Sequence, residues 1–119
     1  MINKVAVIGS GTMGNGIAHV FAQSGFEVKL IDISAEALKK ALATIEKNLN
    51  RQLSKERITQ EQLEATLKNI STYTSTAEAI VDCDLIVEAA TENVDLKLKI
   101  FKDMDANAPA HAILATNTS

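Results

Sequence analysis

Three glycines and one aspartate are the residues of this sequence whose types and spacing point most directly to chemistry. Gly9, Gly11 and Gly14 form the pattern G-x-G-x-x-G, and Asp32 follows further along the chain, at about the 20-residue distance typical of dinucleotide sites. The glycines allow a sharp turn, a close approach of backbone to a diphosphate, and close packing of helix on strand, while the acid accepts hydrogen bonds from a ribose. The pattern therefore predicts a dinucleotide site formed by Gly9, Ser10, Gly11, Thr12, Met13, Gly14 and Asp32.

The acid also favours one dinucleotide over another. The carboxylate of Asp32 would repel a 2′-phosphate, and Ile33 beside it supplies no compensating cation, so NAD is favoured over NADP. FAD-binding proteins share the glycines but tend to carry a glutamate at the ribose position, which makes FAD a lesser alternative. A simple turn followed by a solvated acid is the alternative without a ligand, and the strand and helix expected on either side of the glycines argue against it.

The elements that must position these residues follow from the hydrophobic pattern. Short aliphatic runs predict strands at 4–8, 28–31, 69–74, 85–87 and 111–115. Longer amphipathic runs predict helices at 12–24, 35–53, 61–68 and 94–106. Gly25 and Ser34 are expected to cap the first helix at its end and the second at its start. Met13, Ile17, Val20 and Phe21 are spaced to share one face of the first helix.

This alternation of strands and helices predicts an α/β fold of the Rossmann type, a doubly wound and mostly parallel sheet with helices on both faces. A complete fold of this kind has six strands in the order 3-2-1-4-5-6. Five strands are visible, so we expect one NAD-binding domain over residues 1–119 whose sheet is truncated after the fifth strand.

Composition excludes several other classes of protein. The 119 residues are 46% hydrophobic, which suits one folded domain, and a net charge of −3 with few aromatic residues argues against a nucleic-acid partner. The single Cys83 lies between two aspartates, which argues against a reactive thiolate, and no Cys/His cluster has metal-ligand spacing. No apolar run suits a signal peptide or a membrane span. These features predict a cytoplasmic protein with no metal and no membrane partner.

Three stretches resemble the L-3-hydroxyacyl-CoA dehydrogenase family, which includes 3-hydroxybutyryl-CoA dehydrogenases. They are residues 9–18 (GSGTMGNGIA), 85–97 (LIVEAATENVDLK) and 115–119 (ATNTS). The resemblance covers the whole chain but only about the cofactor-binding half of a typical member. It implies the NAD-binding domain of an oxidoreductase of fatty acid metabolism, which oxidises an L-3-hydroxyacyl-CoA to the 3-ketoacyl-CoA by hydride transfer to NAD.

The resemblance also implies further site residues. Glu92, Lys97 and Asn117 match family positions at the cofactor, and Ser119 matches a polar residue near nicotinamide and substrate. These residues follow the fourth and fifth strands, so they belong at the carboxyl edge of the sheet, where a nicotinamide would lie. A helix-start acid at Glu92 and a surface lysine at Lys97 are the plainer interpretations.

A contact with coenzyme A is implied at Lys55, which matches a family lysine with that role. Lys47, Arg51 and Lys55 recur every four residues and would share one helical face. An ordinary solvated face is the alternative. Asn48 stands where some family members carry a contacting serine, which is a departure from the family pattern.

The catalytic residues that the resemblance implies are not in this sequence. In the family the base is a histidine oriented by a glutamate, both downstream of the Asn-Thr-Ser segment, and neither His19 nor His111 matches it. We therefore expect this chain to bind NAD without turning over substrate. The parent protein would take an acyl-CoA and form a homodimer through a C-terminal helical domain absent from this chain. A non-catalytic NAD-binding module and a related β-hydroxyacid dehydrogenase acting on a small free acid are the alternatives.

Overall fold

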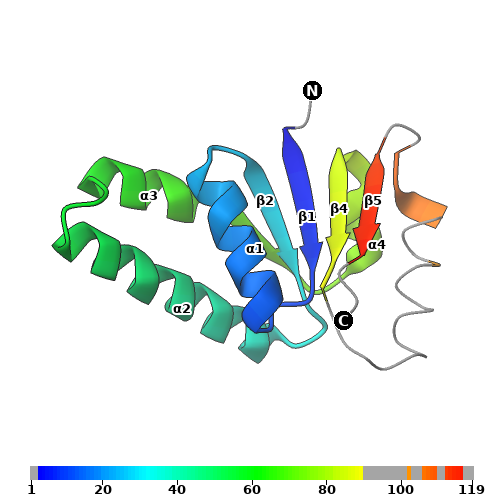
Figure 1. Cartoon of the computed structure of the whole chain (residues 1–119). Coiled ribbons are helices and arrows are strands. Elements are labelled where there is room, and N and C mark those ends of the chain that lie inside the picture. Colours follow the sequence, from blue (N-terminus) through cyan, green and yellow to red (C-terminus); the bar gives the residue numbers. More distant parts are fainter. Residues whose placement is uncertain (1–2, 90–101, 103–105, 110–111, 117–119) are drawn as a thin grey trace.

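The computed structural model describes residues 3–89, 102, 106–109 and 112–116, and within them it contains a five-stranded parallel sheet in the order β3-β2-β1-β4-β5 (Figure 1). The strands are β1 Lys4–Ile8, β2 Glu27–Ile31, β3 Ile70–Tyr73, β4 Leu85–Glu88 and β5 Ile113–Thr116. The helices are α1 Thr12–Gln23, α2 Ala35–Ser54, α3 Gln60–Lys68 and α4 Thr76–Ala79, with a 3-10 turn at Ile80–Asp82. The predicted Rossmann-type strand order is confirmed.

The central strand β1 separates two apolar layers. Val5 and Val7 pack in a cluster with residues of α1, α2 and α3, whereas Ala6 and Ile8 pack with Ala79 and its neighbours on the opposite face. Each of these four β1 residues is at most 3% exposed. Because helices cover both faces of a parallel sheet, near-continuous aliphatic strands such as β1 are stable only in its centre.

Helix boundaries follow local signals that are visible in the sequence. The Ser34 side chain accepts a hydrogen bond from the Ala37 amide at 3.2 Å and caps α2, as predicted. Thr59 and Gln62 form a reciprocal capping box at the start of α3. Gly25 follows α1 with φ +100°, a conformation that favours glycine. Together α2 and α3 form a long helical hairpin beside the sheet (Figure 1).

Met13, Ile17, Val20 and Phe21 share one face of α1, as predicted, but that face is only partly packed. Met13 and Val20 are 49% and 64% exposed, and Ile17 and Phe21 are only partly buried. The buried side instead carries small and polar residues, namely Gly14, Asn15, Ala18, His19 and Ala22. Close contact with the sheet selects small side chains over large ones, and the buried Asn15 is satisfied by donating to the Ala41 carbonyl at 2.8 Å.

Several expectations concern residues near the end of the chain. The helix predicted at 94–106 lies mostly outside the described residues, and so does His111, the first residue of the predicted fifth strand. The short α4 and the 3-10 turn after it were not predicted, because four-residue helices carry no periodic signal. In the described part of the chain, no helix is long and apolar enough to cross a membrane.

A cluster of charged side chains links β1 and β2 to the 3-10 turn that precedes β4. Lys29 of β2 donates to the Ala79 carbonyl at 3.1 Å and to the Asp82 carboxylate at 2.5 Å, and Lys4 of β1 donates to the same carboxylate at 2.8 Å. The hydrogen bond from Lys29, followed by that from Lys4, lowers the pKa of Asp82 below its ordinary value. Lys29 is nearly buried, with 11% of its side chain exposed, so its ammonium depends on this partner.

Replacing Asp82 should therefore cost more stability than replacing its exposed partner. We expect Asp82→Asn to lower the free energy of unfolding by about 1 kcal/mol at neutral pH, a value moderated by the exposure of the carboxylate. Lys4→Gln removes only the exposed arm and should change it less. Because the folded-state pKa of Asp82 is lowered, this contribution is present at neutral pH and is lost as the pH falls through that pKa. Urea denaturation at pH 7 and at low pH measures both effects, and equal losses in the two variants would contradict the assignment.

Candidate dinucleotide site

The turn after β1 has the geometry that its glycines predict. Gly9 adopts φ +102°, a left-handed conformation that favours glycine, and its amide donates to the Ile31 carbonyl at 2.7 Å. A Cβ atom added to Gly14 would lie 1.7 Å from the Gly9 carbonyl oxygen. The first turn of α1 therefore lies directly against the turn that follows β1, and a side chain at position 14 would force them apart.

Gly11 differs from the other two glycines, because nothing in the described chain requires it. It precedes α1 with φ −65°, and an added Cβ would meet no atom within 4 Å. It also leaves the start of α1 without a side-chain cap or an acid in the first turn. Open space over uncapped helix amides suits the backbone contact with a diphosphate that the sequence predicts at this position.

Asp32 is held on both carboxylate oxygens directly after β2. Its Oδ2 accepts from the Ser10 amide at 3.1 Å and from the Ser10 hydroxyl at 2.7 Å, and its Oδ1 accepts from the Ser34 amide at 3.0 Å. Burial alone would raise the pKa of Asp32, but these hydrogen bonds outweigh it and hold the pKa below its ordinary value. The side chain is thus a fixed, ionised acceptor at neutral pH.

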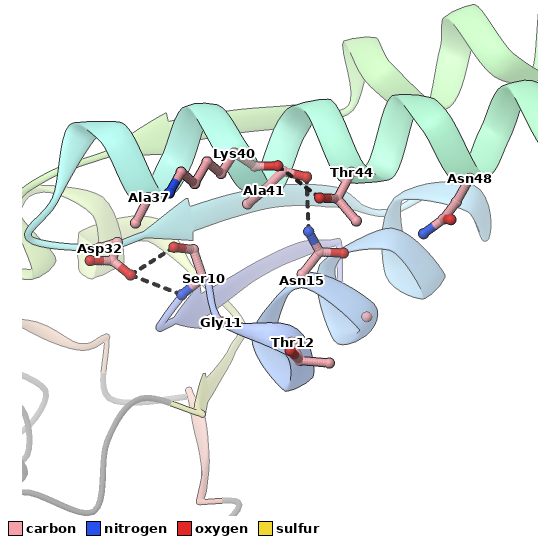
Figure 2. Close-up of a pocket in the computed structure, with 11 residues that line it drawn as sticks. Ser10, Gly11, Thr12, Asn15, Asp32, Ala37, Lys40, Ala41, Thr44 and Asn48 are labelled. Carbon is pink, nitrogen blue, oxygen red and sulfur yellow. Dashed lines mark hydrogen bonds between the residues drawn. The ribbon is translucent and has the colours of Figure 1, made fainter.

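Ser10 and Asp32 line one end of a groove between α1 and α2 (Figure 2). The groove has a volume of about 510 Å³, within the usual range for small-molecule sites. It is lined by Ser10, Gly11, Thr12, Asn15, Gly16, Asp32, Ala37, Lys40, Ala41, Thr44 and Asn48. Of the residues predicted from sequence, Ser10, Gly11, Thr12 and Asp32 thus line one groove, whereas Gly9 and Gly14 are not among its lining residues.

The α2 side of this groove was not predicted. Lys40, Thr44 and Asn48 recur every four residues and all line it, so helical spacing alone could have placed them on one face. In the sequence, Asn48 stands out only as a departure from the family pattern, and nothing marks Lys40 as a site residue. What the sequence does not reveal is which face of α2 turns toward α1.

Met13 and Lys55 also do not line this groove. Met13 lines a second, apolar hollow with Ile17, Val20 and Phe21. Lys55 directly follows Ser54, the last residue of α2, and caps the end of the helix. It therefore lies about 30 Å from the start of that 20-residue helix. Of the three cations predicted to share a helical face, Lys47 and Arg51 thus lie within α2, and Lys55 lies just beyond its last residue.

The carboxyl edge of the sheet is only partly described. Ile8 of β1 pairs with Glu88 of β4, so the chain that follows β4 starts at the edge where the glycine turn lies. Glu88 itself is fully buried there. Glu92, Lys97, Asn117 and Ser119, which the resemblance implies as site residues, lie outside the described residues.

The other reactive side chains of the described region lie outside the groove. His19 is 9% exposed, and its Nε2 lies 2.9 Å from Oε1 of Gln23. Cys83 is buried, and burial, with a smaller contribution from the adjacent aspartates, raises its pKa to about 11. The thiol is therefore unreactive at neutral pH, as predicted, although burial rather than charge is the main cause. Among the described residues, no group of three His, Cys, Asp or Glu side chains could hold a metal ion.

Comparison with known proteins agrees with this geometry. Residues 4–119 match the family described as "3-hydroxyacyl-CoA dehydrogenase, NAD binding domain". The chain is 46% identical over its full length to a 3-hydroxybutyryl-CoA dehydrogenase of Bradyrhizobium diazoefficiens, of which it covers 40%. It is 41% identical over 125 residues to the mitochondrial hydroxyacyl-coenzyme A dehydrogenase of Rattus norvegicus, again covering 40%.

Solved structures give the same result. The crystal structure of 3-hydroxybutyryl-CoA dehydrogenase from Escherichia coli superposes on the whole chain with a TM-score of 0.94 at 43% identity, and the chain covers 25% of it. The (S)-3-hydroxybutyryl-CoA dehydrogenase of Ralstonia eutropha gives a TM-score of 0.93 at 41% identity, with all of this chain and 42% of that one covered. The chain thus spans less than half the length of these relatives, and it belongs to the family of NAD-binding domains of 3-hydroxyacyl-CoA dehydrogenases.

Proposed function

We propose that this chain is the NAD-binding part of an oxidoreductase that oxidises an L-3-hydroxyacyl-CoA, such as 3-hydroxybutyryl-CoA, to the 3-ketoacyl-CoA. The observation that carries the proposal is the pairing of the glycine turn with a fixed carboxylate at Asp32. The family match supplies NAD as the cofactor, and the names of the relatives indicate the class of substrate.

Different residues in and beside the groove contact different parts of NAD. The uncapped amides at the start of α1 hold the diphosphate, and the missing side chain of Gly11 lets the phosphates come close. Asp32 accepts hydrogen bonds from the adenosine ribose. Ile33 follows it with 76% of its surface exposed and offers an apolar surface to the adenine. When bound, NAD supplies the hydride acceptor, and this chain orients it.

The remaining contacts and steps are assigned to Lys55, to residues outside the described region and to residues outside this chain. We propose that Glu92, Lys97, Asn117 and Ser119 face the nicotinamide half of the cofactor, and that Lys55 contacts coenzyme A from the far end of α2. A base that removes the hydroxyl proton must lie within hydrogen-bond distance of it, and His19 is held on the buried side of α1. We further propose a cytoplasmic homodimer in which a C-terminal helical domain supplies that base and the subunit contact.

The ribose contact can be tested by removing the carboxylate. Asp32→Ala should weaken NAD binding to this chain about ten- to hundredfold, because a hydrogen bond to a charged group contributes about 1.5–3 kcal/mol. Glu46→Ala, which removes an exposed acid of α2, is the matched control. Asp84 would be a poor control, because it accepts hydrogen bonds from the amides of Asn3 and Lys4. Calorimetric titration giving equal affinities for the Asp32 and Glu46 variants would reject the ribose contact.

The pH dependence of binding should follow the ionisation of the same carboxylate. Since hydrogen bonds from Ser34 and Ser10 lower the pKa of Asp32 against the opposing effect of burial, the acceptor stays ionised well into the acid range. NAD affinity should therefore be flat from about pH 8 to pH 5 and fall only below about pH 4. An inflection near pH 6 would contradict this account.

Two glycine substitutions should separate folding from binding. Gly14→Ala places a Cβ against the Gly9 carbonyl, so it should lower the free energy of unfolding by about 2 kcal/mol or more. Gly11→Ala meets no atom of the chain and should leave stability unchanged, yet weaken NAD binding at least about tenfold by filling the space of the phosphates. Thermal unfolding and calorimetry measure the two effects. Unaltered binding by a stable Gly11→Ala variant would contradict the diphosphate contact.

Turnover separates the chain from the proposed parent enzyme. The 119 residues should bind NADH but reduce no acetoacetyl-CoA, because neither His19 nor His111 matches the histidine that exchanges the substrate proton in the family. Loss of absorbance at 340 nm above the rate without protein is the readout. Measurable reduction by this chain would show that the base lies within it.

A further inference from the structure

A cationic side chain lines the dinucleotide groove together with the acid. Lys40 of α2 and Asp32 line the same groove, and Figure 2 shows the Lys40 side chain running back along α2 toward Ala37, at the Asp32 end. Within the described residues, no hydrogen bond or ion pair occupies its ammonium group. The ammonium is thus available to an anion entering the groove.

A hydroxyl group lies at the same end of the groove. The Ser10 hydroxyl donates to Asp32 Oδ2 at 2.7 Å, and Thr12, at the start of α1, also lines the groove. A hydroxyl that donates to a carboxylate donates equally well to a phosphate oxygen. If the carboxylate were neutral, this end of the groove would present a hydroxyl, an ammonium and the amino end of α1, which is the donor set that binds phosphate.

The ribose hydroxyl proposed to contact Asp32 is the position at which NADP carries its extra phosphate. A phosphate there would meet the ionised carboxylate at close range, and the like charges would oppose binding. We propose that Ser10 and Lys40 form a phosphate subsite which the charge of Asp32 alone keeps closed, so that Lys40 determines NADP affinity once Asp32 is neutral. This proposal rests on the ribose contact proposed above and adds Lys40 as a specificity-determining residue.

The experiment compares NAD and NADP affinities of the 119-residue chain by calorimetry. Asp32→Asn, which keeps the size of the side chain and removes its charge, should raise the ratio of NADP to NAD affinity at least about tenfold. Adding Lys40→Gln should lower that ratio by about three- to tenfold. Raising the salt concentration should lower the ratio in Asp32→Asn but not in the double variant that lacks Lys40. If circular dichroism shows that Asp32→Asn is unfolded, Asp32→Ser provides a second neutral variant.

Lys39→Gln is the matched control in the same background. Lys39 adjoins Lys40 and is likewise exposed, but it lines a different groove with Leu42 and Thr72. Its replacement should leave the NADP to NAD ratio unchanged. Equal effects of the two lysine substitutions, or no rise in the ratio for a folded neutral variant that still binds NAD, would overturn the proposal. If the unsubstituted chain bound neither dinucleotide, the proposed NAD site itself would fail, and the subsite with it.

Discussion

The contact between the first turn of α1 and the turn after β1 is the constraint on which the rest of the site depends. Gly14 lies so close to the Gly9 carbonyl that a single Cβ would overlap it. This contact fixes where α1 begins, and therefore where its unpaired amides lie relative to the end of β2. It also favours small residues such as Ala18 and Ala22 on the buried side of α1, where the helix comes close to the sheet.

The second requirement is an acceptor that is already in place before a ligand arrives. Ser10, within the glycine turn, and Ser34, the cap of α2, hold the two oxygens of Asp32 from opposite sides. The carboxylate thus couples the turn after β1 to the turn after β2. Fixing it in the folded chain removes the side-chain ordering cost from the binding step. The same hydrogen bonds keep it ionised, which is the state that accepts from ribose hydroxyls and opposes a phosphate.

Sequence reasoning recovered the features that local chemistry determines. The glycine turn, Asp32, the Ser34 cap and the strand order each depend on a few neighbouring residues or on a general rule of chain topology. It did not show that Met13 and Val20, which share the predicted apolar face of α1, are exposed, while the side that carries Ala18 and Ala22 is buried. That outcome depends on how closely two elements approach, and hydrophobic spacing does not encode it. Lys40 was missed for the same reason, because the sequence does not show which face of α2 turns toward α1.

The central claim, that the amides at the start of α1 and the Asp32 carboxylate together hold NAD, is tested most directly by following backbone amide resonances as NAD is added. The account predicts that the amides of Ser10, Gly11, Thr12 and Ser34 shift in a saturable manner, while those of α3 do not. Saturable shifts confined to residues away from the groove, or no shifts at millimolar NAD, would contradict it.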